Sequence, residues 1–325
     1  MSTIPALRWW PVLACCLGAT TVSALVAAPV AMAKVHVVHA QDAPASATDA
    51  PPSLAVMPAA PPPQVQIPFG PTLKPAAPPR LSATDLAQQM VAAIDAASPG
   101  TRVGIDVVDT NTGAVLASVD ADQQFYTASV VKLLIGIDAF EGQGWQPDSL
   151  TTDQVQRMLS ASDDDIADEL WDINGGNAIV DRMISRIGLT GTQPPDDPAQ
   201  WGETLTTAQD VVAVYRYLTT SVPQPARDLI VNALVDVTPV AADGTDQYFG
   251  IPDALPTAGW AVKPGWMSLD SSTTLDTTGL VGANAAAPLH YAVVVLSAQP
   301  AGVDWGTGGA ALTAGVAVLR GRLTA

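Results

Sequence analysis

The chain has 325 residues, of which 48% are hydrophobic, so it is long enough for one substantial domain with tails and can build a packed core. Its net charge of −17 argues against a nucleic-acid or anionic-membrane surface, since both require clustered lysine and arginine side chains. Small molecules, and neutral or cationic partners, fit this charge better.

The N-terminal segment predicts export. Arg8 is the one positive charge in front of an apolar stretch over 9–32, and the Ala-Met-Ala sequence at 31–33 has the small-x-small pattern that signal peptidase cleaves. We therefore predict a signal peptide over 1–33 and a secreted or cell-envelope protein. An uncleaved anchor is the alternative, because the stretch is long enough to cross a bilayer. In either case the N-terminal segment contacts the membrane.

The only two cysteines, Cys15 and Cys16, lie inside that segment. The mature protein would then have no disulfide, no thiol chemistry and no cysteine metal site. Cys15 also ends a Val-Leu-Ala-Cys sequence that is weakly similar to a lipoprotein box, although the apolar run before it is short. Cleavage, anchoring and lipidation therefore stay open.

Residues 34–80 are predicted to form a disordered linker. Over 41–80 the composition shifts to proline and alanine, with runs such as Pro61-Pro62-Pro63. Such a stretch cannot build a core and favours extended polyproline conformations. We expect it to hold the following domain away from the membrane or through a cell-wall layer; a dispensable tail is the alternative.

The folded domain is predicted to span 81–325, with a sheet part over 81–127 and 258–325 and a helical part over 128–257. Apolar residues at helical spacing predict helices over 82–98 and 309–323. Strand-like segments cover 102–108, 114–119, 260–267, 273–279 and 290–297. These elements predict an α+β fold, an α/β sandwich in which an antiparallel sheet of about five strands from both chain ends is flanked by helices and carries an inserted all-helical subdomain.

The motif Ser129-Val-Val-Lys132 opens a run over 129–137 that is apolar on almost every face, which is typical of a helix buried in a core. A spacing of three places the Ser129 hydroxyl and the Lys132 amine on one helix face. Loss of water there lowers the lysine pKa and lets the neutral amine take the serine proton. The helix start adds N–H groups that favour negative charge. Alone, the motif also fits an N-cap serine with a snorkelling lysine.

The motif Ser162-Asp163-Asp164 lies on a helix that we predict over 158–171. Its serine can pass a proton to a leaving nitrogen. The same residues also make a good helix start, because a serine caps the first turn and aspartates favour the helix dipole. The acidic stretch over 163–169 fits a solvated helix face better than a calcium site.

The motif Lys263-Pro264-Gly265 lies on a predicted strand, directly before Trp266. Lys263 supplies positive charge near a substrate carboxylate, and Gly265 lets a substrate lie close to the strand. The following N–H, that of Trp266, can help to form an oxyanion hole. Of the four lysines, only Lys132 and Lys263 lie in the predicted domain. Each motif is weak alone, but in this order they predict a catalytic site.

With these motifs, the chain over about 81–325 resembles the serine beta-lactamase and penicillin-binding-protein superfamily, in particular the class A beta-lactamase fold. Segments 102–113 and 201–210 are similar to that family's first hairpin and to the segment after its omega loop. Shorter motifs make the chain most similar to the LppW-type envelope proteins of actinobacteria; they are Ser162-Asp-Asp164, Gly175-Gly-Asn-Ala178, Phe249-Gly-Ile-Pro-Asp253 and Lys263-Pro-Gly-Trp-Met267.

The resemblance implies a role for each motif residue. Ser129 is the implied nucleophile and Lys132 its base partner. Ser162 is the implied proton relay, and Lys263 the implied carboxylate anchor. The amides of Ser129 and Trp266 would form the oxyanion hole.

Two substitutions and one spacing weaken substrate recognition relative to that family. Asp164 replaces an amide, so a hydrogen-bond donor to a substrate carbonyl becomes an ionised acceptor. Pro264 replaces a threonine or serine and removes both a hydroxyl and a ladder N–H, which is tolerable on an edge strand. The interval from Ser129 to Ser162 is also short for a class A enzyme, so one wall of the cleft is trimmed.

The omega-loop glutamate that activates the deacylating water in class A enzymes is missing from 189–198. Glu203 comes too late in the segment, and Asp196 or Asp197 would be a shorter substitute. We therefore expect Ser129 to be acylated and the acyl-enzyme to be hydrolysed slowly.

The sequence thus predicts an exported, monomeric serine acyl-enzyme, acting as a D,D-peptidase, esterase or weak beta-lactamase on cell-wall peptides or related amides. The alternative is a non-catalytic descendant that binds cell-wall peptide or glycan. No cofactor or metal is expected, because histidine and cysteine spacing and a Gly-rich phosphate loop are missing. His290 is the one histidine of the domain, and a structural role suits it better than a catalytic triad.

Overall fold

The computed structural model describes residues 82–324. The predicted signal peptide or anchor, both cysteines and the linker over 34–80 therefore lie outside the described residues. Within 82–324, every helix is too short or too polar to cross a bilayer.

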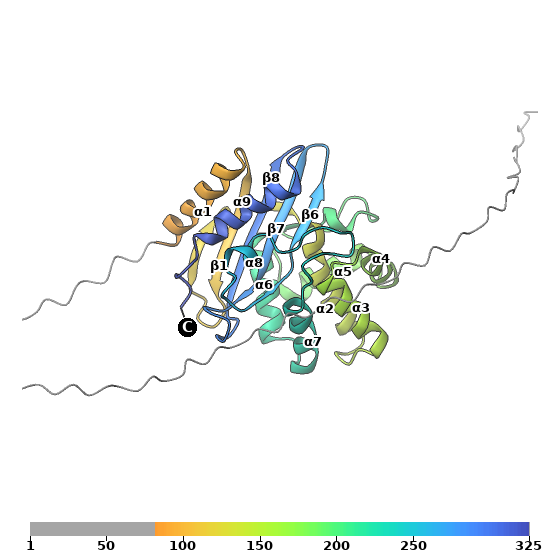
Figure 1. Ribbon diagram of the computed structural model, residues 1–325. Helices are drawn as coiled ribbons and strands as arrows, with labels where there is room; N and C mark the ends of the chain where they lie inside the picture. The colour runs from red at the N-terminus through yellow and green to blue at the C-terminus, as the bar shows by residue number, and fades with distance from the viewer. Residues whose placement is uncertain (1–81, 325) are drawn as a thin grey trace, which may run out of the picture. The chain divides into compact units, whose positions relative to one another are not determined.

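A six-stranded antiparallel sheet lies at the centre of this domain (Figure 1). Its order is β2-β1-β8-β7-β5, and β6 pairs with β7 on the same side as β5. The strands are β1 (Arg102–Asp109), β2 (Val115–Val119), β5 (Trp260–Val262), β6 (Gly265–Ser268), β7 (Ser272–Val281) and β8 (Tyr291–Pro300). The prediction of an antiparallel sheet built from both chain ends is confirmed. The strand predicted over 260–267 is interrupted at Lys263-Pro264, which gives six strands instead of five.

Helices α1 (Ala83–Ala97) and α9 (Trp305–Ala317) lie side by side over one face of the sheet (Figure 1). Alternate residues of β1, which are Val103, Ile105 and Val107, contribute to the core under these helices. Ser82 caps α1 in a capping box, as the cap-like sequence start predicts. The closing helix predicted over 309–323 instead spans Trp305–Ala317. It begins earlier because Asp304 accepts a hydrogen bond from the Thr307 amide and caps its first turn.

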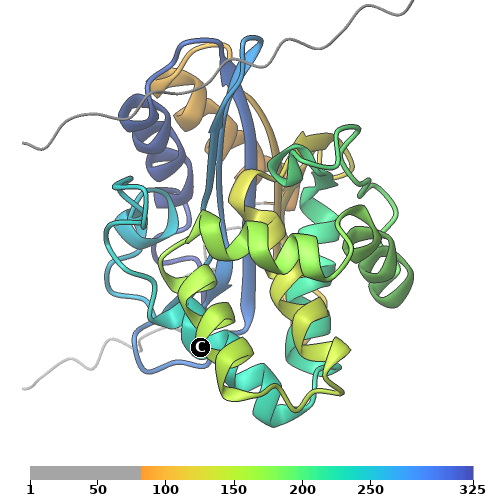
Figure 2. The same cartoon turned by 90° about the vertical axis from the view of Figure 1, so that its right-hand side faces the viewer.

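The other face of the sheet packs against a group of helices within 128–257 (Figure 2). These are α2 (Lys132–Gly142), α3 (Ser149–Ser160), α4 (Asp164–Ile173), α5 (Asn177–Ile187), α6 (Ala208–Thr220) and α7 (Gln224–Val235), with the short α8 (Ile251–Ala254) on the α9 side. All residues of α2 from Lys132 to Phe140 are buried, which confirms the buried helix that its apolar sequence predicts. Together with the sheet, this arrangement confirms the α+β fold class.

The single helix predicted over 158–171 is wrong, because two helices meet there at Ser162. This residue has φ +52°, in the left-handed region that a continuing helix excludes. Asp163 then caps α4 by accepting a hydrogen bond from the Ile166 amide at 3.2 Å. The serine of the motif therefore lies in a turn between α3 and α4 and not on a helix.

The sequence did not predict a small two-stranded sheet, which joins the segment before α2 to the segment after α5. Strand β3 (Gln124–Tyr126) pairs antiparallel with β4 (Leu205–Thr207). The Thr127 amide extends the pairing by donating to the Thr204 carbonyl at 2.9 Å. This pairing brings the short helix η2 (Trp201–Glu203) beside η1 (Ala128–Val131).

The first prediction concerns the core that carries α2. Phe140→Ala should lower the free energy of unfolding by about 3–5 kcal/mol, because Phe140 is fully buried and its loss leaves a cavity. Leu150→Ala is the control, since Leu150 is 65% exposed, and it should change stability by less than about 0.5 kcal/mol. Urea unfolding followed by circular dichroism measures both. Equal effects would mean that the core under α2 is not packed as described.

Candidate active site

Ser129 lies in η1, a single 3-10 turn that leads directly into α2. It is 5% exposed, and its neighbours Val130 and Val131 are buried in the core. The preceding Ala128 has φ +41°, a strained conformation that costs an L-residue about 1–3 kcal/mol. Such strain persists only where surrounding packing enforces it, and it is common at functional sites. The predicted nucleophile thus sits on a rigid turn at the start of a buried helix.

Lys132 is fully buried, and its ammonium group is surrounded by hydrogen-bond acceptors. Nζ donates to Ser129 Oγ at 3.0 Å, to the Ser162 carbonyl at 2.9 Å and to Ser162 Oγ at 3.2 Å. It also forms an ion pair with Asp164. Burial lowers the pKa of Lys132 below its ordinary value, while Asp164 opposes this by stabilising the charged form. The predicted pairing of Ser129 with Lys132 is therefore present in the geometry.

Ser162 joins the two lysines of the domain. Besides the contact with Lys132, its Oγ accepts a hydrogen bond from Lys263 Nζ at 2.9 Å. Ser162 is 3% exposed, so this hydroxyl is sealed from bulk water. The hydroxyl of this turn residue therefore lies between the amines of Lys132 and Lys263.

Lys263 is fully buried on the edge of the sheet. Its N–H donates to the Thr278 carbonyl at 2.9 Å, and the Thr278 hydroxyl returns a bond to the Lys263 carbonyl at 2.8 Å. Pro264 has no N–H for the ladder, so the strand is interrupted here, and the Pro264 carbonyl accepts from Lys263 Nζ at 2.9 Å. Burial lowers the pKa of Lys263 well below its ordinary value of 10.5, and nearby Lys132 lowers it further.

Gly265 lies directly against the turn that carries Ser129. A Cβ atom placed on Gly265 would lie 2.8 Å from the Thr127 carbonyl oxygen and 3.2 Å from the Ser129 amide nitrogen. Only glycine permits this approach of β6 to η1. Trp266 follows, with its indole N–H donating to Asp243 at 3.0 Å. The amides of Ser129 and Trp266 are thus on adjacent segments, and their use as an oxyanion hole stays a prediction.

A hollow of about 290 Å³ opens at Ser129. Its wall includes Asp164 and, from the motif strand, Trp266 and Met267. The remaining lining residues are Ala128, Asp168, Ala199, Gln200, Trp201 and Gly202. The hollow therefore combines a buried nucleophile with acidic and aromatic side chains.

Asp168 and Trp201 are site residues that the sequence analysis missed. Asp168 lies one helical turn after Asp164 on α4, so the two carboxylates share a face. Its Oδ1 accepts a hydrogen bond from the Trp201 indole N–H at 2.7 Å. The ring of Trp201 in turn lies 4.8 Å from Lys132 Nζ. The four-residue spacing from Asp164 was the available signal for Asp168; placing Trp201 required the β3–β4 pairing.

The segment over 189–198 supplies no carboxylate to this hollow within the described residues. Asp197 accepts a hydrogen bond from the Ala199 amide at 3.0 Å. The Pro195 and Pro198 carbonyls accept from Asn177 and Trp171, which ties the segment to the neighbouring helices. Asp196, Asp197 and Glu203 are all absent from the lining of the hollow.

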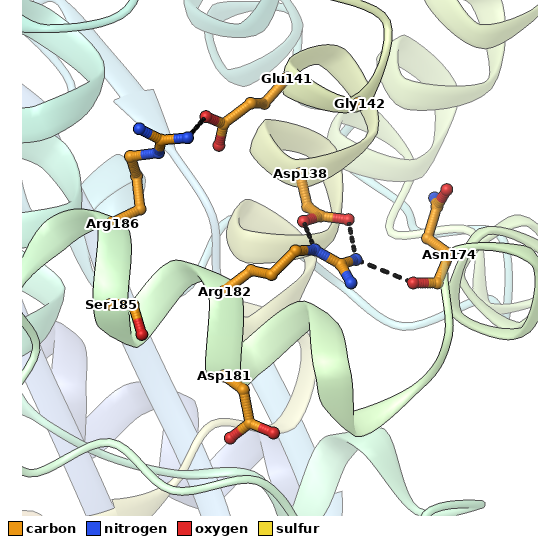
Figure 3. Close-up of a pocket in the computed structure, with 8 residues that line it drawn as sticks. All are labelled: Asp138, Glu141, Gly142, Asn174, Asp181, Arg182, Ser185 and Arg186. Atoms are coloured by element: carbon orange, nitrogen blue, oxygen red, sulfur yellow. Dashed lines mark hydrogen bonds and ion pairs between the residues drawn. The ribbon is translucent and has the colours of Figure 1, made fainter.

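A larger hollow of about 690 Å³ lies elsewhere, between α2 and α5 (Figure 3). Its charges are mostly paired: Arg182 binds Asp138 through both carboxylate oxygens, and Arg186 pairs with Glu141. None of its lining residues belongs to the three motifs. The hollow at Ser129 is therefore the candidate active site, because it alone of the two is lined by residues of the three motifs.

Comparison with known proteins identifies the family of the chain. The model of the "Beta-lactamase enzyme family" matches residues 85–144. The protein named "Putative lipoprotein LppW" of Mycobacterium tuberculosis is 34% identical over 239 residues, which are 71% of this chain and 74% of that protein. The chain belongs to the LppW family. The same identity and coverage hold for LppW of Mycobacterium bovis, so the predicted similarity to LppW-type proteins is confirmed.

Solved structures show that this LppW-family chain has the fold of the serine beta-lactamase and penicillin-binding-protein superfamily. A beta-lactamase from Chitinophaga pinensis matches with a TM-score of 0.60 at 15% identity, over 73% of this chain and 98% of that one. The class A beta-lactamase from Mycobacterium abscessus matches with a TM-score of 0.56 at 18% identity, over 72% and 97%. A mutant of PBP-A, in an acyl-enzyme complex with penicillin G, gives 0.57 at 18% identity, over 75% and 98%.

The second prediction concerns the burial of Lys263. A buried lysine with a lowered pKa binds fewer protons folded than unfolded, so the wild type should gain stability relative to Lys263→Met as pH rises from 7 toward 10.5. The gain should reach up to about 1.4 kcal/mol per pH unit. Urea unfolding at several pH values measures it.

Arg322→Met is the control for this titration, because arginine keeps its charge across the range and its difference from wild type should not change with pH. A pH-independent difference for Lys263→Met would mean that Lys263 stays charged in the folded protein.

Proposed function

We propose that this chain is an exported, penicillin-recognising type of serine acyl-enzyme, a D,D-peptidase, esterase or weak beta-lactamase with Ser129 as nucleophile. The observation that carries the proposal is the contact of Ser129 Oγ with Lys132 Nζ at 3.0 Å. Ser129 lines the hollow, and Lys132 is fully buried. A lysine held only for packing would not need its amine on a serine hydroxyl. The LppW relatives are named lipoproteins, which supports a place in the cell envelope.

Acylation follows from the arrangement of the two lysines. The neutral form of Lys132 takes the proton as Ser129 Oγ bonds to the substrate carbonyl carbon. When the tetrahedral adduct collapses, the carbonyl re-forms, the carbon–nitrogen or carbon–oxygen bond breaks, and the proton passes from Lys132 through Ser162 to the leaving group. Lys263 holds the Ser162 hydroxyl at 2.9 Å and so keeps this relay oriented. The amides of Ser129 and Trp266 would bind the developing oxyanion.

Deacylation is expected to be slow. Hydrolysis of the acyl-enzyme requires a base that activates water, and the segment over 189–198 brings none to the hollow. Of the two carboxylates that line the hollow, Asp164 is paired with Lys132, and Asp168 is held by the hydrogen bond from the Trp201 indole N–H. The proposed enzyme therefore accumulates its acylated form with substrates such as beta-lactams, whose leaving group stays attached.

A non-catalytic protein that binds cell-wall peptide or glycan is the second candidate, and the ion pair of Lys132 with Asp164 favours it. A carboxylate in this position stabilises the protonated lysine, which cannot accept the Ser129 proton. Burial acts in the opposite direction and lowers the pKa of Lys132. The net direction of the Lys132 pKa is downward, and together with the contact to Ser129 Oγ at 3.0 Å this favours the enzyme.

The third prediction tests the nucleophile. Incubation with a penicillin, followed by intact mass spectrometry, should give a single adduct that persists for minutes or longer, and Ser129→Ala should abolish it. Fluorophosphonate labelling provides the same test without a beta-lactam. Ser162→Ala serves as the intermediate case, with slower labelling, since the nucleophile remains. Turnover of penicillin without an adduct would contradict slow deacylation, and no Ser129-dependent labelling by either reagent would favour the binding protein.

The fourth prediction concerns Asp164. Because its carboxylate raises the pKa of Lys132, Asp164→Asn should lower that pKa, so that Ser129 labelling begins to rise at a lower pH than in the wild type. The amide also restores a donor to a substrate carbonyl and should speed acylation by penicillin about tenfold or more. Labelling rates between pH 5 and 10 measure both effects. Asp165→Asn, on the same helix but outside the hollow, should match the wild type; an unshifted profile in Asp164→Asn would show that Lys132 is not the titrating base.

A further inference from the structure

The charges that face the hollow at Ser129 are negative. Asp164 and Asp168 line it from α4, and the side chain of Asp164 is 58% exposed. The cations nearby, Lys132 and Lys263, are both fully buried. Among the described residues that line the hollow, none is a lysine, arginine or histidine. A substrate entering the hollow therefore meets carboxylates before it meets any positive charge.

The two carboxylates differ in how far their charge is offset. Asp164 forms an ion pair with Lys132. Asp168 accepts a hydrogen bond from the Trp201 indole, which is neutral, and within 82–324 it forms no ion pair with lysine or arginine. An N–H dipole orients a carboxylate without cancelling its charge. Asp168 thus leaves a fixed negative charge at the edge of the hollow.

The rest of the wall suits a cation as well. Trp201 and Trp266 contribute aromatic rings and Met267 a thioether to the lining. Aromatic faces attract cations through the ring quadrupole, and the Trp201 ring already lies 4.8 Å from Lys132 Nζ. Carboxylates beside indole rings are a combination that binds ammonium groups.

The same wall is poorly suited to binding a carboxylate on the substrate. Lys263 donates to Ser162 and to the Pro264 carbonyl, and it is shielded from the hollow. Pro264 offers neither a hydroxyl nor an N–H. An anionic group would approach Asp164 and Asp168 without a donor to meet it, and like charges at this distance repel.

We propose that this site prefers acyl donors that carry a cationic group, such as an ammonium, over neutral or anionic ones, with Asp168 as the residue that selects for the charge. The proposal rests on the proposed acylation of Ser129 and names its substrate class.

The experiment uses two nitrophenyl esters of identical shape, one of trimethylammoniobutyric acid and one of its tert-butyl isostere, which differ only in charge. Acylation of Ser129 in the full chain is followed by nitrophenol release and intact mass, with Ser129→Ala as background. Each rate is divided by the rate of the same ester with imidazole, which removes its intrinsic reactivity. A nitrophenyl ester of 5-sulfopentanoic acid provides the anionic arm, because its sulfonate does not attack its own ester.

The wild type should be acylated by the cationic ester about fivefold faster than by the neutral one, and more slowly still by the anionic one. Raising the salt concentration should reduce the preference, because exposed charges are screened. Asp168→Asn should bring the ratio close to one, whereas Asp165→Asn, whose side chain lies outside the hollow, should keep it.

Three results would overturn the inference, and they are distinguishable. Ser129 acylation by all esters with a cationic-to-neutral ratio of one or less in the wild type would refute the charge selection and leave the proposed function intact. The same holds for a preference that Asp168→Asn does not reduce. No Ser129-dependent acylation by any ester would overturn the proposed function and this inference together.

Discussion

The site depends on the burial of two lysines around a single serine hydroxyl. Ser162 Oγ lies 3.2 Å from Lys132 Nζ and 2.9 Å from Lys263 Nζ, and both lysines are fully buried. Removing an ammonium from water costs several kcal/mol even after relaxation, and two of them side by side add repulsion. Four hydrogen-bond acceptors around Lys132 offset part of this cost. Burial also lowers the pKa of both amines, which favours their uncharged forms. Such a cost is characteristic of a functional site, because packing alone would favour apolar residues here.

The same constraint accounts for the irregular backbone around the site. Ala128 and Ser162 have positive φ, and the strand that carries Lys263 is interrupted at Pro264. Each irregularity lies within one residue of a motif side chain. A regular helix or strand would direct these side chains along its own face, whereas the three motifs come from three separate elements and must converge on one point. The strained backbone thus lies at the residues that position the motif side chains.

This convergence also explains which features could be predicted from the sequence. Helical spacing of apolar residues predicted α1, a strand-like segment predicted β1, and a run that is apolar on almost every face predicted the buried α2. The order of the three motifs indicated that their lysines would share a site. The turn at Ser162 was missed because Ser-Asp-Asp is equally compatible with the inside and the start of a helix. Trp201 enters the site through the β3–β4 pairing, which joins residues about 80 positions apart and leaves no periodic signal. The position of Trp201 could not be predicted, because it depends on long-range strand pairing and not on local propensity.

Asp164 couples recognition to reactivity. Its carboxylate stabilises the charged form of Lys132 and also faces the hollow, where an amide would have served as donor to an acyl carbonyl. A substrate cation that approached this carboxylate would compete with Lys132 for it and would add a positive charge nearby. Both effects lower the pKa of Lys132 and favour the neutral amine that can accept the Ser129 proton. A neutral substrate would leave the ion pair undisturbed, and an anionic one would stabilise the charged lysine, so the arrangement proposed to bind a cation would also be the one in which binding activates the nucleophile.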